Sequence, residues 1–292
     1  MPKPIFIIGN QRSGTTWLAN ILCQHSKIVG VQSEPFGIRE SYYFNIIDRY
    51  FGNLKNDNNF NQFIDVFSSS DYFILTKVDK DIFYKERPTN YVQSFKLLMN
   101  TFAEKNNAEF WLEKTPGHTL YLNKLSKYFK TASFIGIKRD IVDILKSAVR
   151  RNTFRNNRIK KLFILRRVLQ YYKYDKHLNK FNSISNRILL INYEFLRKNP
   201  KKIISKVCQF LNIEFESSLL TQHYEKGTSF SSFDNKFERE RVLTKFEIKM
   251  VRWLSHIFRI LPYIFYRILY SYQLHIRPRT LPLSLWRDSK RN

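Results

Sequence analysis

The sequence is poor in cysteine and in acidic residues, and each shortage excludes a class of protein. Its 292 residues include only two cysteines, Cys23 and Cys208, and both lie among apolar neighbours. A disulfide framework or a cysteine-based metal site requires more cysteines at defined spacings. We therefore expect two small buried side chains in a reducing compartment. Disorder is also excluded, because 43% of the residues are hydrophobic and 16% are aromatic.

Acidic residues are half as frequent as basic ones, at 24 against 50, and the formal net charge is +26. The imbalance is greatest over residues 138–180, where fourteen basic residues meet three acidic ones. Such a stretch attracts polyanions such as nucleic acid, an anionic glycan or acidic lipid headgroups, or it forms a solvated face that favours solubility.

A leader segment is also lacking from the sequence given, because an apolar strand begins almost at Met1. This leaves no room for a signal peptide or an anchor helix, so we expect the chain to fold in the cytoplasm.

What the sequence does contain is a strand, a glycine loop and a helix at its start. Ile5–Ile8 is a short apolar run ending at Gly9, and Thr15–His25 carries apolar residues on one side. Between them, Gly9 and Gly14 have the spacing of a phosphate-binding loop, in which backbone N–H groups and a helix N-terminus face an anion.

This loop departs from that of the nucleotide-cleaving enzymes at one position. Thr15 stands where those enzymes have a lysine, and the cation is Arg12, inside the loop. We therefore expect the loop to hold a phosphate without the lysine that acts on a γ-phosphate.

Four further short runs have the character of buried strands: 28–31, 110–116, 132–138 and 187–192. Helical stretches separate them, at 60–68, 91–106, 141–151, 160–181 and 201–211, with a loop around Arg87 and Pro88. The alternation predicts an α/β fold, with a parallel sheet of about five strands and helices on both faces. We expect a catalytic domain over residues 1–245 and a helical C-terminal extension over 246–292.

Gln11–Leu18 and Ile137–Ser147 together resemble the sulfotransferases that use 3′-phosphoadenosine 5′-phosphosulfate (PAPS), and Glu113–Pro116 and Ile191–Pro200 add to the likeness. The resemblance covers roughly residues 4–212 and is strongest to the bacterial and Golgi-type carbohydrate and tyrosylprotein branches. It implies a P-loop-type fold and transfer of a sulfuryl group without a metal ion.

By resemblance, the loop and the strand ends bind PAPS. Ser13, Gly14, Thr15 and Thr16 would cradle the 5′-phosphate, and Arg12 would hold the phosphosulfate bridge. The other implied contacts are Trp17 on the adenine, with Tyr193 as a second candidate, and Arg139 with Ser147 on the 3′-phosphate. Taken singly, Trp17 also suits a core anchor and Ser147 a surface helix.

The acceptor needs a general base, and the histidine that follows Lys-Thr in the cytosolic branch is replaced here by Pro116. The resemblance places the base at Glu34, with Glu40 and His118 as weaker candidates, while Lys114 would stabilise the departing bridging oxygen. We expect the acceptor to offer a hydroxyl or an amine, foremost on a carbohydrate or glycolipid.

Two rival functions remain in view. A phosphate-loop nucleotide kinase requires a lysine after Gly14 and a magnesium site, and the sequence offers neither. A nucleic-acid-binding protein would use the basic stretch 138–180, which contains no recognisable binding module, so we expect no nucleic-acid partner.

The C-terminal extension has a basic and apolar pattern. Arg252, Arg259 and Arg267 are spaced to share one helical face, and Trp, Phe, Ile and Leu side chains fill the rest. Two readings are evenly matched. One is an interfacial helix on a membrane, which would place the enzyme on its inner face, and the other is a helix, split at Pro262, that closes over the core.

Overall fold

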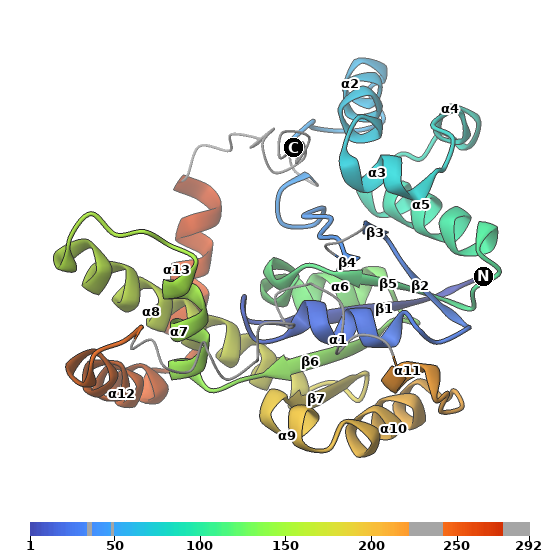
Figure 1. The fold of residues 1–292 in the computed structure, drawn as a ribbon. Coiled ribbons are helices and arrows are strands. Elements are labelled where there is room, and N and C mark those ends of the chain that lie inside the picture. The colour runs from blue at the N-terminus through green and yellow to red at the C-terminus, as the bar shows by residue number, and fades with distance from the viewer. Residues whose placement is uncertain (34–36, 48–49, 222–241, 277–292) are drawn as a thin grey trace.

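The computed structural model describes residues 1–33, 37–47, 50–221 and 242–276. Its centre is a five-stranded sheet in the order β2-β5-β1-β6-β7, in which every pairing is parallel (Figure 1). Its strands are β1 (Lys3–Gly9), β2 (Ile28–Gly30), β5 (Phe110–Lys114), β6 (Ser133–Lys138) and β7 (Ile188–Asn192). The five predicted strands and the α/β class are confirmed. Two very short strands, β3 (Gln32–Ser33) and β4 (Gly37–Ile38), form a separate antiparallel pair.

Strand β1 lies at the centre of the sheet because its side chains are apolar on both faces. Ile5, Phe6, Ile7 and Ile8 are fully buried, as expected of a parallel strand covered by helices on each side. Register pairs Ile7 with Lys114 of β5 and Gly9 with Ile137 of β6. The carboxyl ends of the three strands therefore lie at one edge, where ligands bind in open parallel sheets.

Two hydrophobic cores cover the two faces of the sheet. Ile5 and Ile7 contribute to the core beneath α1, α10 and α11, and Phe6 and Ile8 to the core beneath α2–α6 and the end of α8. The helices of these layers are α1 (Thr15–Leu22), α2 (Asp57–Ser68), α3 (Asp71–Thr76), α4 (Asp81–Glu86), α5 (Tyr91–Lys105), α6 (Leu122–Tyr128), α8 (Asn157–Asn182), α9 (Tyr193–Lys198), α10 (Pro200–Leu211) and α11 (Ser218–Thr221).

Most of the predicted helices are present, and the differences involve short helices. The loop expected around Arg87 contains α3 and α4, each six residues long, and α9 follows β7 where only a strand end was expected. A 3₁₀ helix, η2 (Pro116–Tyr121), joins β5 to α6. The two cysteines are free, with Cys208 buried and Cys23 partly buried.

A third core lies beside the sheet and includes part of the C-terminal extension. Helix α7 (Ile141–Arg150) and the first half of α8 pack there against α12 (Lys245–Ile260) and α13 (Tyr263–Ile276). Val251 and Tyr266 are fully buried in this core, and Lys160 forms an ion pair with Glu247 at 2.9 Å. One side of the extension thus closes over α7 and α8, and Pro262 separates its two helices, as the second of the two alternatives predicted.

Candidate functional site

The loop between β1 and α1 is held in shape by its own backbone. Ser13 donates to the carbonyl oxygen of Asn10 through both its N–H, at 3.1 Å, and its hydroxyl, at 2.7 Å. Gly14 has a φ of 100°, and a Cβ there would lie 2.6 Å from the ring of Tyr193. Only glycine fits this position, because other residues are strained at that φ and would also clash with the ring.

The loop ends at the N-terminus of α1, which has no side-chain cap. Gly14 is the N-cap residue and has no side chain to accept a hydrogen bond from the first N–H groups of the helix. Their partial positive charge favours an anion at this point. Thr15 is nearly buried and Thr16 is half-buried. The predicted phosphate cradle, Ser13–Thr16, is therefore a continuous segment at one helix end.

Arg12 joins this loop to α7, the helix that follows β6. Its φ of 72° lies in the left-handed region, which is uncommon for a residue with a side chain. Its Nε–H donates to the hydroxyl of Ser147 at 3.0 Å. The residues predicted for the phosphosulfate bridge and for the 3′-phosphate, 135 positions apart in the chain, thus lie in direct contact.

Arg139 completes the same cluster from the end of β6. One of its terminal nitrogens donates to the carbonyl oxygen of Arg12 at 3.2 Å, and its guanidinium lies 4.1 Å from the centre of the Tyr193 ring. Its Nε is buried and has no hydrogen-bond partner within the described part of the chain. A buried donor without an acceptor is costly, and an anionic oxygen bound here would satisfy it. The residues present therefore fit an anionic nucleotide.

Two further arginines surround Arg12, and sequence reasoning missed both. The pKa of Arg12 is lowered to about 10 by burial and then by the positive charges of Arg151, Arg139 and Arg167. Arg167 of α8 also donates to Gln11 in the loop, at 2.7 Å. Arg151 stands four residues after Ser147 and so on the same helical face, which was a usable signal. Arg167 is one of many cations in α8, and no sequence pattern distinguishes it.

Strand β5 brings a buried lysine to the same edge of the sheet. Lys114 is 2% exposed, and its ammonium forms an ion pair with Glu40 at 2.9 Å. The carboxylate of Glu40 is one-quarter exposed and also acts on the pKa of Arg12, which it raises. The predicted leaving-group lysine and a candidate base are therefore partners across the site.

His118 has a geometry that does not suit a general base. Its Nδ1 lies 2.7 Å from the carboxylate of Glu113, and the backbone N–H of Phe44 donates to its Nε2 at 3.2 Å. Because a donor occupies Nε2, the proton of the neutral ring is on Nδ1. The ring is fully buried, so its lone pair is not offered to a substrate.

Glu113 is the centre of a buried network that positions this end of β5. It accepts hydrogen bonds from Thr115 at 2.6 Å and Ser41 at 2.8 Å, in addition to the contact with His118. Burial alone would raise the pKa of Glu113, but the contacts with His118, Thr115 and Ser41 outweigh burial and lower it. The network ties the segment that carries Glu40 to the strand that carries Lys114.

The remaining predicted residues are placed differently or lie outside the described residues. Trp17 is 4% exposed and packs in the core with its ring centre 5.4 Å from that of Tyr193, which agrees with the core-anchor alternative. Adenine stacking by Trp17 or Tyr193 stays a prediction. Glu34 lies outside the described residues. No group of His, Cys, Asp and Glu within the described ranges could hold a metal ion.

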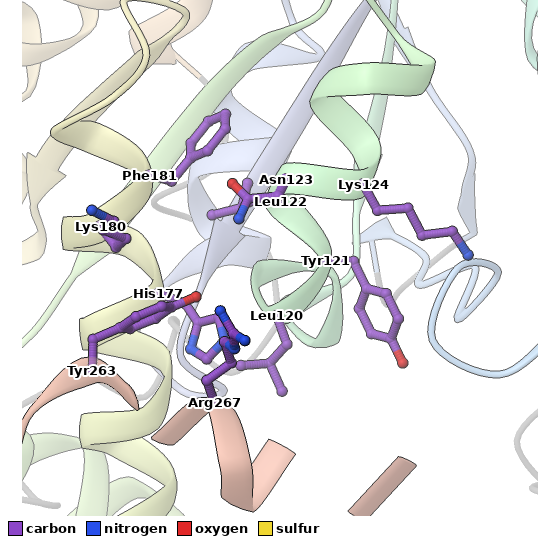
Figure 2. Close-up of a pocket in the computed structure, with 10 residues that line it drawn as sticks. All are labelled: Leu120, Tyr121, Leu122, Asn123, Lys124, His177, Lys180, Phe181, Tyr263 and Arg267. Atoms are coloured by element: carbon purple, nitrogen blue, oxygen red, sulfur yellow. The ribbon is translucent and has the colours of Figure 1, made fainter. Parts of the chain in front are cut away.

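A cavity of about 260 Å³ lies beyond η2, between α6, the end of α8 and α13 (Figure 2). Helix η2 forms one wall of the cavity and begins two residues after Lys114. The hydroxyl of Thr119 in η2 accepts from the N–H of Gly9 at 2.9 Å and donates to the carbonyl oxygen of Gly9 at 3.1 Å. The cavity is thus connected to the loop through one short helix. Its lining includes the cations Lys124, Lys180 and Arg267, without an acidic residue.

Comparison with protein families gives one match, to a model described as the sulfotransferase family, over residues 4–217. No curated protein sequence matches the chain.

Several solved structures resemble the chain in fold. A sulfotransferase from Mycobacterium tuberculosis is 12% identical, with 87% of this chain and 76% of that one covered and a TM-score of 0.50. The sulfotransferase domain from the curacin biosynthetic pathway is 21% identical, with coverages of 95% and 99% and a TM-score of 0.49. A mouse sulfotransferase complexed with PAP is 15% identical, with coverages of 92% and 89% and a TM-score of 0.47.

Proposed function

Since this chain belongs to the sulfotransferase family, we propose that it transfers a sulfuryl group from PAPS to a hydroxyl or amine of a carbohydrate or glycolipid. Membership of the family confirms the enzyme class predicted from the motifs. The observation that carries the proposal is the meeting of Arg12, Arg139 and Ser147 beside the uncapped end of α1. A nucleotide with phosphates at both its 5′ and 3′ positions would match these groups.

Different residues of the site would bind different groups of the donor. The N-terminus of α1 with Ser13–Thr16 would hold the 5′-phosphate. Arg139, Ser147 and Arg151 would hold the 3′-phosphate, which distinguishes PAPS from ATP. Arg12, next to both groups, would bind oxygens of the phosphosulfate, where its planar guanidinium can contact two oxygens at once.

The transfer itself requires a base and a stabilised leaving group. A carboxylate, at Glu34 by resemblance, would take the proton of the acceptor hydroxyl as its oxygen forms a bond to sulfur. The bond between sulfur and the bridging oxygen breaks, and the negative charge that develops on that oxygen would be stabilised by Lys114 and Arg12. Glu40 holds the ammonium of Lys114 in position until then.

The acceptor half of the proposal is supported by the cavity beyond η2. It combines aromatic rings, which suit the apolar faces of sugars, with three cations, which suit an anionic group. Tyr263 and His177 form one wall, with ring centres 5.1 Å apart (Figure 2). Burial lowers the pKa of His177, so the charge of the cavity at neutral pH comes from its lysines and its arginine. This lining favours an anionic glycan or glycolipid.

Nucleic acid is a less suitable partner because the basic stretch 138–180 does not form one free surface. Lys138 pairs with Asp175 at 2.7 Å, Lys160 with Glu247 at 2.9 Å, and Arg167 donates to Gln11. Several of its cations are therefore used inside the protein. We place the enzyme in the cytoplasm, at the inner face of the membrane where a glycolipid acceptor is made.

Calorimetry tests the donor. We expect 3′,5′-ADP to bind much more tightly than 5′-AMP in the absence of magnesium. Arg139→Ala should remove most of that difference, because hydrogen bonds to charged groups contribute about 1.5–3 kcal/mol. Equal affinities of the native protein for the two nucleotides would contradict the assignment of PAPS.

Labelled PAPS tests the acceptor. Supplied with neutral and anionic glycolipids, the enzyme should label the anionic ones, and Lys180→Gln should raise their KM about tenfold, as expected for the loss of one charged contact. The matched control is Lys176→Gln, one turn earlier on α8 and outside the cavity. If Lys180→Gln labels the glycolipids as well as the native enzyme does, the acceptor does not bind in this cavity. The calorimetric result for the donor would not be affected.

A further inference from the structure

A surface at one end of the molecule exposes an unusual number of large apolar side chains. Among the described residues, sixteen large hydrophobic side chains are strongly exposed, and nine of them belong to the first turns of α8 or to α12 and α13. Trp253, Ile260 and Ile268 are each more than 60% exposed. The nine are Ile159, Leu162, Leu165, Phe246, Trp253, Ile260, Ile264, Phe265 and Ile268.

These side chains lie on the outer sides of helices whose inner sides are already packed. Val251 of α12 and Tyr266 of α13 are fully buried in the core that they share with Ile164 and Val168 of α8. The exposed parts of α8 and α12 also adjoin each other, since the ammonium of Lys161 lies 5.3 Å from the centre of the Phe246 ring. The apolar exposure therefore remains after the extension has packed on the core.

The same surface is strongly cationic. Residues 157–174 include no acidic residue, and residues 242–269 include one, Glu247, which is 5% exposed and paired with Lys160. The cations whose residues are exposed there are Arg158, Lys161, Arg166, Lys245, Lys249, Arg252, Arg259 and Arg267. Exposed apolar side chains thus alternate with positive charges that no acidic residue in the described part of this surface neutralises.

We propose that the exposed sides of α8, α12 and α13 form a docking surface for an anionic lipid bilayer. Charge complementarity and the apolar side chains together favour this partner. A bilayer buries Ile, Leu and Trp side chains below its headgroups while anionic headgroups bind the cations. Nucleic acid would match the cations but leave the aliphatic side chains in water. A second copy of the chain would bring together two surfaces that are both positive.

The described residues contain no helix that is long and apolar enough to cross a membrane. The proposed mode of binding is therefore peripheral. Arg267 lies on this surface and also lines the cavity beyond η2. Docking would bring the mouth of the cavity next to the headgroups, where a glycolipid presents its sugar. The docking surface does not depend on the acceptor assignment, because its charge and exposure are properties of the free protein.

Vesicle co-sedimentation of the full chain tests the proposal. We expect strong binding at low salt to phosphatidylcholine vesicles that contain phosphatidylglycerol, and little binding to phosphatidylcholine alone. Salt should weaken the binding without abolishing it, since the apolar contribution is not screened. Replacing Arg252 and Arg259 together by Gln should weaken it about thirtyfold, as expected for the loss of two charges near the headgroups.

Matched controls separate this surface from the net charge of +26. Lys201→Gln with Lys202→Gln removes the same charge from exposed positions on α10 and should leave vesicle binding nearly unchanged. Trp253→Gln with Ile260→Gln should abolish the binding that persists at high salt, whereas Ile184→Gln, an exposed apolar residue elsewhere, should not. Every variant should still bind 3′,5′-ADP, which shows that it is folded.

Three outcomes would overturn the proposal. The full chain could ignore anionic vesicles at low salt. The α10 variant could lose as much binding as the α12 charge variant, which would mean that only diffuse charge attracts the protein. Analytical ultracentrifugation could show a dimer that the Trp253 and Ile260 substitutions dissociate, in which case a second copy of the chain covers this face.

Discussion

Arg12 is a partly buried cation among other cations, and this arrangement is unfavourable in the free enzyme. Burial and the charges of Arg151, Arg139 and Arg167 lower its pKa to about 10, so it remains charged at neutral pH in surroundings that disfavour the charge. A group with a lowered pKa that stays protonated reduces the stability of the native state at that pH. A bound polyanion would reverse the effect. The cluster thus lowers the stability of the free protein and raises its affinity for a polyanion, a compromise that is common at functional sites.

Arg151→Gln tests the role of the arginine that sequence reasoning missed. Loss of its charge should weaken 3′,5′-ADP binding about tenfold, because a charged contact is lost. It should also raise the melting temperature of the free protein, because one repulsive neighbour of Arg12 is removed. The control is Arg150→Gln, the preceding residue on α7, which is not among the charges that chiefly shift the pKa of Arg12. If both variants bind the nucleotide equally well, Arg151 is not part of the site.

The general base is tested by two carboxyl-to-amide substitutions. Glu34→Gln should leave 3′,5′-ADP binding intact and lower turnover about 10²–10⁴-fold, the range for loss of a general base. Glu40→Gln should lower turnover less, since Glu40 is the partner of Lys114. If turnover survives in Glu34→Gln and is lost in Glu40→Gln, the assignment is wrong and Glu40 takes the proton.

At the scale of elements, the end of β5 is the most tightly connected part of the site. Glu113 reaches Ser41 and His118, and Ser41 and Tyr42 both donate their N–H groups to the hydroxyl of Thr115. Two segments, the chain around Ser41 and Tyr42 and the helix η2 that carries His118, are therefore fixed to the end of β5. Buried networks of this kind stabilise a single arrangement when every member is satisfied.

Glu113→Gln should destabilise the protein in a pH-dependent way. The pKa of Glu113 is lowered in the native state, so its ionised form contributes stability above the unfolded pKa of about 4.3, and this contribution is lost as pH falls through the folded pKa. Urea unfolding should show a loss of about 1.5–3 kcal/mol at pH 7 that shrinks below about pH 4. Glu109→Gln, at an exposed ion pair just before the same strand, should have little effect at either pH. A loss independent of pH would mean that the charge of Glu113 is not what matters.

The sequence predicted those helices and strands whose pattern of apolar and polar residues lies within a short stretch of the chain. The strands appear as short apolar runs, and strand ends with polar residues located Arg12, Lys114 and Arg139. The six-residue helices α3 and α4 were missed because helices of that length depend on tertiary packing, here of Phe73 and Phe83. The pair Lys114–Glu40 spans 74 positions, and whether His118 has a free lone pair depends on the N–H of Phe44. Contacts between residues so far apart in the chain depend on the tertiary fold and could not be predicted from the sequence.

The whole molecule carries a net charge of +26, and its compact state is destabilised by self-repulsion. Raising the salt concentration should therefore raise the melting temperature by screening. Saturation with 3′,5′-ADP at matched ionic strength should raise it further, since a ligand at 100 times its Kd adds about 2.7 kcal/mol. Arg139→Ala should retain the salt effect and lose most of the nucleotide effect. A nucleotide that acts no differently from salt would argue against a specific site.

The position of β1 has a consequence for how the protein is made. This strand is synthesised before both of its neighbours, which are encoded far downstream: Lys3 pairs with Phe110, 107 positions later, and Ile5 with Ser133. At about 5–20 residues per second, translation takes roughly 5–20 s to supply the first partner. Throughout that interval Ile5–Ile8 is an apolar segment whose backbone groups lack their sheet partners, with Lys3 as the nearest preceding charge. The strand on which the site is built is thus exposed to aggregation until its partners are made, and shielding by a chaperone would protect it.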